Sequence, residues 1–161
     1  GALLMQKQIK ILLTLLIALF LSVSCSKDNV TNPIKTKEQM LQQKWQDNDT
    51  TYGTSQYVIT TSKFDSLYNN STSYSFDIKH IKWTSDTAGI IYGQYTANTY
   101  SPEVVGKWYA VSFKDLTETT IKICGASKGS DFSAENFIEA ISKFTEANGY
   151  FGTFSDCTAV R

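Results

Sequence analysis

Between residues 44 and 125 the sequence consists of short segments rich in aromatic and β-branched residues, separated by clusters of Asn, Ser, Thr, Asp and Gly. Segments of this kind favour β-strands, and the clusters between them favour turns. The pattern therefore predicts a mainly β domain. We expect strands at 44–52, 56–65, 73–84, 89–96, 107–114 and 119–125, and a final strand at 150–154.

Alternation within these segments predicts which face is buried. In 107–114, Trp108 and Ala110 alternate with Tyr109, Val111 and Phe113. Successive side chains of a strand point to opposite faces, so we expect the Tyr-Val-Phe face to point to the core.

The connections between the expected strands are short. The turns at 69–71, 85–87 and 116–118 are rich in Asn, Ser, Thr and Asp, which favours hairpins and hence antiparallel neighbours. The simplest topology is an antiparallel meander, either as a sheet or as a small, partly closed barrel.

Residues 133–144 break the strand pattern. Ala134, Phe137, Ile138 and Ile141 recur at helical spacing, and Ser133 is expected to be the N-cap. We therefore predict one C-terminal amphipathic helix that closes a side or an end of the sheet. A shorter helix of one or two turns, ending near residue 43, is indicated by the capping pair Thr36 and Gln39.

A short helix leading into a first strand with Trp45, and a late helix beside a meander, resemble a lipocalin-type barrel. The Gly-x-Trp motif of that family is absent at Gln43-Lys44-Trp45. Gly106-Lys107-Trp108 matches the motif but lies in the middle of the chain, where the family does not place it. The resemblance thus covers the pattern of elements. It implies a small barrel and transfers no ligand residues.

The N-terminus has the features of a secretory signal. Lys7 and Lys10 precede an apolar run at 11–23, which is too short for a bilayer that requires about twenty residues. We assign residues 1–24 to a signal peptide. Residues 1–4 precede a natural-looking start at Met5 and are not used in the fold argument.

Leu21-Ser22-Val23-Ser24-Cys25 resembles the lipobox of bacterial lipoproteins, with Leu21 one place further from the cysteine than is usual. The resemblance implies that Cys25 is acylated and becomes the new N-terminus, anchoring the protein to a membrane through lipid. An ordinary secretory signal and an uncleaved anchor are the alternatives. Polar residues 25–37 would form a tether, and 38–161 a single β-rich domain.

The residues after Cys25 bear on the membrane that holds the protein. Ser26 is not the aspartate that retains many lipoproteins at the inner membrane, which by resemblance favours the outer membrane. Lys27 and Asp28 resemble the export tags of surface lipoproteins. We therefore expect a lipid-anchored protein of the cell envelope, at the periplasmic face or the cell surface.

Two cysteines remain for the domain, Cys124 and Cys157. In an oxidising compartment an even pair most simply forms a disulfide, which is what we predict. A zinc site formed with His80 would lack one ligand and has the wrong spacing.

The charge distribution argues against nucleic acid as a partner. Removal of the signal leaves 13 basic against 15 acidic residues, because Lys7 and Lys10 leave with it. Lys and Arg are scattered singly, whereas a phosphate-binding surface needs them clustered.

Catalytic signals are weak. Gly125-Ala126-Ser127-Lys128-Gly129 matches a nucleophile elbow, but that motif needs a histidine downstream, and His80 is upstream. The carboxylate pairs Asp47/Asp49 and Asp115/Glu118 are common on surface strands and turns. We expect no enzyme activity, no cofactor and no metal.

The chain is rich in aromatic residues, with 3 Trp, 9 Tyr and 9 Phe. Many of them are expected to stabilise the strands as cross-strand pairs. The remainder suit a binding role, for a small apolar ligand or a glycan. The alternatives are a protein-interaction module, such as an inhibitor or adhesin, and less readily a hydrolase. The candidate ligand-binding residues are Tyr57, Tyr74, Tyr92, Trp83 and Trp108.

Overall fold

The computed structural model describes residues 34–161. The expected signal peptide, Cys25 and most of the tether lie outside the described residues. Residues Lys35–Arg161 form one compact unit. In this part of the chain no helix is both long and apolar enough to cross a membrane.

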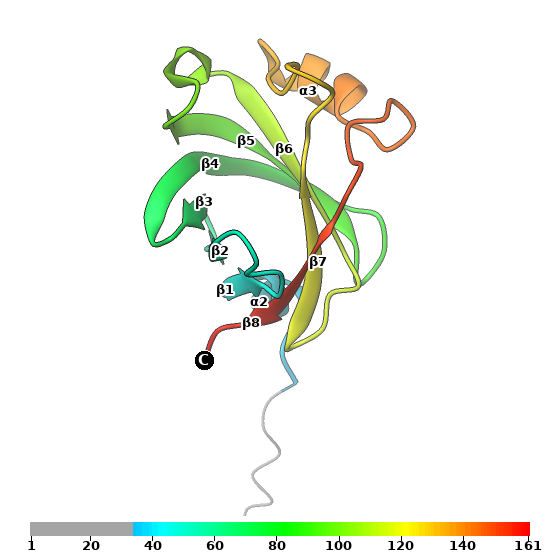
Figure 1. Ribbon diagram of the computed structural model, residues 1–161. Coiled ribbons are helices and arrows are strands. Elements are labelled where there is room, and N and C mark those ends of the chain that lie inside the picture. The colour runs from blue at the N-terminus through cyan, green and yellow to red at the C-terminus, as the bar shows by residue number, and fades with distance from the viewer. Residues whose placement is uncertain (1–33) are drawn as a thin grey trace, which may run out of the picture. The chain divides into compact units, whose positions relative to one another are not determined.

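The unit is a closed antiparallel barrel in which each strand pairs with the next and the last pairs with the first (Figure 1). This confirms the prediction of a mainly β antiparallel meander, and the barrel is closed rather than partly closed. The elements are α2 (Lys37–Leu41), β1 (Lys44–Asp47), β2 (Ser55–Ile59), β3 (Lys63–Tyr68), β4 (Ser71–Trp83), β5 (Gly89–Asn98), η1 (Pro102–Val104), β6 (Trp108–Lys114), β7 (Thr120–Gly125), α3 (Phe137–Lys143) and β8 (Ser155–Ala159).

The expected strand at 44–52 is shorter and ends at Asp47, whose side chain accepts a hydrogen bond from the Asp49 backbone N–H and begins a turn. Two further expected strands were wrong. The segment 56–65 is two strands, because the side chain of Thr60 accepts a hydrogen bond from the Lys63 backbone N–H at 3.0 Å and forms a tight turn. The last strand is Ser155–Ala159 rather than 150–154, and it pairs with β1. These two changes supply the strands that close the barrel.

Both helices are present. Thr36 and Gln39 form the predicted capping box of α2. The later helix begins at Phe137 rather than near Ser133, because the Asn136 side chain accepts a hydrogen bond from the Glu139 backbone N–H at 2.9 Å. Asn136 is therefore the N-cap, and Ser133 lies before the helix.

The connections divide between the two ends of the barrel, as they must in an antiparallel meander. Those at 48–54, 69–70, 99–107 and 126–154 lie at one end, which we call the loop end. Those at 60–62, 84–88 and 115–119 lie at the other. The chain enters at this second end through α2 and leaves it after β8, so we call it the terminal end (Figure 1).

Apolar side chains fill the interior towards the terminal end. Phe64 and Phe76 stack with ring centroids 4.9 Å apart, and both are fully buried. Trp45 is also fully buried, and its indole N–H donates to the Leu41 carbonyl of α2 at 3.1 Å. Because Leu41 is itself buried, α2 closes the terminal end.

Helix α3 covers the outer face of β5 and β6. Phe137 packs on Trp108, with centroids 4.8 Å apart, and the Tyr92 hydroxyl donates to the Phe144 carbonyl at 3.3 Å. The predicted inward face of Tyr109, Val111 and Phe113 is confirmed. The opposite face of β6 is covered as well, so aromatic residues occur on both faces of this strand.

The junction between α2 and β1 yields a stability prediction. Trp45→Ala should lower the free energy of unfolding by about 3–5 kcal/mol, because it leaves a cavity and removes the partner of the Leu41 carbonyl. Tyr52→Ala, at a side chain that is 88% exposed, should change it by less than about 0.5 kcal/mol. Urea titration followed by circular dichroism measures both. Equal effects of the two substitutions would contradict the proposed role of Trp45.

Candidate binding site at the loop end

Four tyrosines from different strands gather inside the barrel: Tyr74 of β4, Tyr95 of β5 and Tyr109 of β6 near the loop end, and Tyr57 in the middle of β2. The Tyr95 and Tyr109 rings stack with centroids 4.7 Å apart, and the Tyr74 ring meets Tyr109 edge-on at 5.5 Å. Tyr57 lies across β3 from Tyr74, since both pair with Ser66. We call these four residues the tyrosine cluster.

Gly125 at the end of β7 makes room for this cluster. A β-carbon at this position would collide with the Tyr109 hydroxyl and lie 3.7 Å from the Tyr74 hydroxyl. Any side chain here would therefore displace the hydroxyl ends of the two rings. The glycine is required for space, since its backbone is not in the left-handed region.

Burial raises the pKa of each hydroxyl in the cluster. It raises the pKa of Tyr57 to about 12, although hydrogen bonding with Ser155 opposes the shift. The pKa values of Tyr74 and Tyr109 lie well above the ordinary value for the same reason, and that of Tyr95 is raised as well. All four hydroxyls are neutral near pH 7, as ordinary tyrosines are, and can both donate and accept hydrogen bonds.

The hydroxyls of the cluster lie near polar groups of other residues. Tyr95 and Tyr109 are only 3% and 6% exposed, and they lie close enough for each to alter the pKa of the other. Ser155, Ser66 and Asn98 lie close enough to Tyr57, Tyr74 and Tyr95, respectively, to shift the pKa values of these tyrosines through hydrogen bonding. Tyr57 and Tyr74 are only partly buried. Hydroxyls placed in this way suit a ligand that offers hydrogen-bonding groups.

Exposed apolar side chains also concentrate at the loop end. Tyr52 is 88% exposed on the β1–β2 connection, and Tyr100 is 77% exposed on the β5–β6 connection. Tyr68 donates its hydroxyl to the Tyr52 carbonyl, which links neighbouring connections. Val105 and Ile138 complete this set, which we call the rim. Long connections on a rigid barrel commonly carry binding residues.

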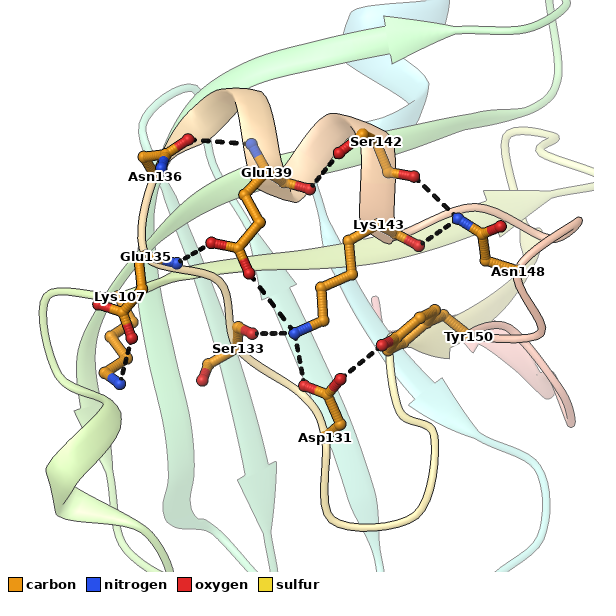
Figure 2. Close-up of polar contacts among 10 residues, drawn as sticks. All are labelled: Lys107, Asp131, Ser133, Glu135, Asn136, Glu139, Ser142, Lys143, Asn148 and Tyr150. Carbon is orange, nitrogen blue, oxygen red and sulfur yellow. Dashed lines mark hydrogen bonds and ion pairs between the residues drawn. The ribbon is translucent and has the colours of Figure 1, made fainter.

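A polar network fixes the long connection at 126–154 (Figure 2). The Lys143 ammonium contacts the Asp131 carboxylate at 2.6 Å and donates to the Ser133 carbonyl at 2.7 Å. Asp131 also accepts from the Tyr150 hydroxyl at 2.6 Å. These contacts lower the pKa of Asp131, with Lys143 as the main cause. The segments before and after α3 are thus held together.

Figure 2 shows further hydrogen bonds and an ion pair that hold the same connection in place. The Asn148 side-chain amide donates to the Ser142 and Lys143 carbonyls at 2.8 and 3.0 Å, which ends α3. Lys107 pairs with Glu135 at 2.6 Å and thereby joins the β5–β6 connection to the α3 segment. The loop end is therefore largely preorganised, although the Lys107 pair is exposed and contributes little stability by itself.

The five sequence-predicted ligand residues do not form one site. Tyr57 and Tyr74 belong to the tyrosine cluster. Tyr92 and Trp108 lie on the outer face beneath α3. Trp83 lies near the terminal end, where it meets Phe113 edge-on with centroids 5.0 Å apart, and Lys37 lies over its ring at 4.7 Å.

Sequence reasoning missed Tyr95 and Tyr109 as site residues. The alternation of β6 placed Tyr109 inside but did not distinguish a core residue from a site residue. The missing signal is the pairing register, which places Tyr109 opposite Gly93, beside Tyr95.

The predicted disulfide is absent, since Cys124 and Cys157 are both free and buried. The reason is the register between β7 and β8. Cys157 pairs with Ile121, three residues from Cys124, and an odd offset places the two side chains on opposite faces of the sheet. Burial also raises the pKa of Cys157 to about 12, which makes it a poor nucleophile.

The weaker catalytic candidates have ordinary surroundings. Ser127 donates to the Gly129 carbonyl at 3.3 Å, and His80 packs against Phe137 with centroids 5.6 Å apart. Asp47 accepts from the Asp49 backbone N–H at 3.0 Å, and Asp115 pairs with Lys122. Within residues 34–161, no group of three potential metal ligands is found.

Comparison of the chain with protein-family models, with curated protein sequences and with solved structures gives no match.

The tyrosine cluster predicts sensitivity to alkaline pH. The pKa of Tyr57 is about 12 in the folded protein, above the unfolded value near 10. The folded state therefore favours the neutral hydroxyl. The stability that results is complete below pH 10 and is lost as the pH rises through 12. Tyr57 should contribute up to about 2–3 kcal/mol to this loss. Tyr57→Phe should therefore reduce the difference in unfolding free energy between pH 8 and pH 11. Urea titrations at both pH values test this, with exposed Tyr52→Phe as the control, and equal pH dependence in the two variants would contradict it.

Proposed function

We propose that the protein is a lipid-anchored cell-envelope protein with a non-catalytic binding role, and that its ligand docks at the loop end. The ligand class favoured is small and uncharged, either a short glycan or a small apolar molecule with hydroxyl or carbonyl groups. The observation that carries this proposal is the convergence of four neutral tyrosine hydroxyls, from β2, β4, β5 and β6, at the end bearing the long connections.

The chemistry of the cluster supports an uncharged ligand. No lysine or arginine is among its described neighbours, whereas the Asp47 charge is close enough to raise the pKa of Tyr57. An anion would therefore meet repulsion without a compensating cation. Tyrosine rings give flat apolar surfaces for sugar or apolar rings, and their hydroxyls bond the polar groups.

The path of the chain supports the anchored arrangement. Residues 34–36 lead into α2 at the terminal end, on the opposite side of the barrel from the rim. A tether running from acylated Cys25 would thus reach the barrel at this end. This point of entry suits a protein of the outer membrane that is anchored through its N-terminal segment.

Binding to an array of neutral oligosaccharides tests the proposal. Tyr57→Phe removes one hydroxyl and keeps the ring, so it should lower the affinity for a bound oligosaccharide by about two- to ten-fold. The double variant Tyr52→Ser/Tyr100→Ser should weaken it if the ligand also contacts the rim. Val160→Ser, at an exposed apolar residue of the terminal end, should have no effect. If the protein binds no oligosaccharide on the array, the glycan assignment is contradicted.

A protein-interaction module is the second candidate, and the exposed rim specifically favours it. Tyr52, Tyr100, Val105 and Ile138 present apolar surface on several connections of the loop end. Aromatic side chains of this kind often dominate protein interfaces.

This candidate predicts a different response to the same variants. In-cell cross-linking of the anchored protein should capture a defined partner, and Tyr52→Ser/Tyr100→Ser should abolish the capture. Tyr57→Phe should leave it unchanged, because that hydroxyl lies inside the barrel. Capture that survives the rim substitutions would exclude the rim as the interface.

A further inference from the structure

A concave site lies on the outer wall of the barrel, away from the tyrosine cluster. It is a groove of about 430 Å³, lined by residues of β4, β5 and β6 and by Thr145 and Glu146 from the connection after α3. Its volume falls within the range typical of small-molecule sites, which is about 300–1,000 Å³.

The strand register explains the composition of the groove floor. Lys82 pairs with Ile90, Ile90 with Ser112, and Ser112 with Cys124. Residues paired in this way form a row across the sheet and share one face. Since Val111 and Phe113 point into the barrel, the row points outwards. Ile90 and Ser112 therefore form the floor of the groove. Lys82 lies on one side of this floor, and the 145–146 segment lies on the other.

Ser112 is the polar residue of this floor. It is only 4% exposed, and it lines the groove. A serine hydroxyl can donate one hydrogen bond and accept others. It therefore offers a hydrogen-bond donor to a molecule in the groove.

The charges of the lining favour an anion. Lys82 and Lys114 both line the groove, and neither forms an ion pair within residues 34–161. The Lys114 ammonium lies 3.9 Å from the centroid of the Phe154 ring. Glu146 is the only acidic residue of the lining, so the two lysines leave an excess of one positive charge.

We infer that this groove binds a small carboxylate attached to an apolar body. The carboxylate would lie between Lys82 and Lys114 and accept the Ser112 hydroxyl proton in a hydrogen bond. The apolar body would cover Ile90 and Ala88, which are also part of the lining. This site is independent of the function proposed for the loop end, which favours an uncharged ligand.

The inference is tested with 3-phenylpropanoate as the probe and 3-phenylpropan-1-ol as its uncharged counterpart. Amide signals of the full chain are followed by two-dimensional NMR during titration. We expect saturable shifts at Ile90 and Ser112, with the carboxylate binding at least about two-fold more tightly than the alcohol. Absence of saturable shifts, or equal binding of the two compounds, would overturn the inference.

Charge variants give effects of opposite sign. Lys82→Gln and Lys114→Gln should each weaken carboxylate binding by about two- to five-fold, whereas Glu146→Gln should strengthen it. Ser112→Ala should weaken it by about two- to ten-fold. Lys79→Gln is the matched control, because Lys79 is exposed on the same strand and lies outside the groove. Weaker binding by Glu146→Gln, or an equal effect of Lys79→Gln and Lys82→Gln, would contradict the proposed charge contacts.

Discussion

The pairing of β1 with β8 determines the rest of this structure. Trp45 lies opposite Ala159 and Asp47 opposite Cys157, so strands more than a hundred residues apart in sequence close the barrel. Closure removes the exposed sheet edges. Because the strands form an antiparallel meander, the long connections lie at one end and the chain enters at the other. The loop end and the entry of the chain through α2 are thereby separated by the length of the barrel.

The interior is divided along the barrel axis, and the division has an energetic basis. Near the terminal end, rings such as Phe64 and Phe76 bury apolar surface without polar atoms. Near the loop end, the inward residues are tyrosines, whose hydroxyls lose hydration when buried and need partners. Ser155 lies near the Tyr57 hydroxyl and Ser66 near the Tyr74 hydroxyl, and water or ligand can supply further partners. A domain selected only for stability would gain more from phenylalanine at these positions.

Much of the fold is predictable from the sequence. The alternation in 107–114 gave the inward face of β6, and the Asn69-Asn70 turn has the positive φ angles, 48° and 64°, that tight hairpins require. The division of 56–65 into two strands was missed because Thr60 is β-branched and resembles a strand residue. The tyrosine cluster was harder to predict than the fold. Helix α3 covers the outer face of β5 and β6, so aromatic residues occur on both faces of these strands. Tyr92 and Tyr95 look alike in the sequence, yet they point to opposite sides of β5.

The connection between β7 and β8 contributes to both candidate sites. Tyr150, through its bond to Asp131, fixes the part of this connection that returns to the loop end. Thr145 and Glu146 line the outer groove, and Asn148 holds them by bonding the last carbonyls of α3. The position of Glu146 relative to Lys114 is therefore set by α3 rather than by the barrel. Because Lys143 links the same helix to Asp131, a shift of α3 would change the geometry of the groove and of the loop end together.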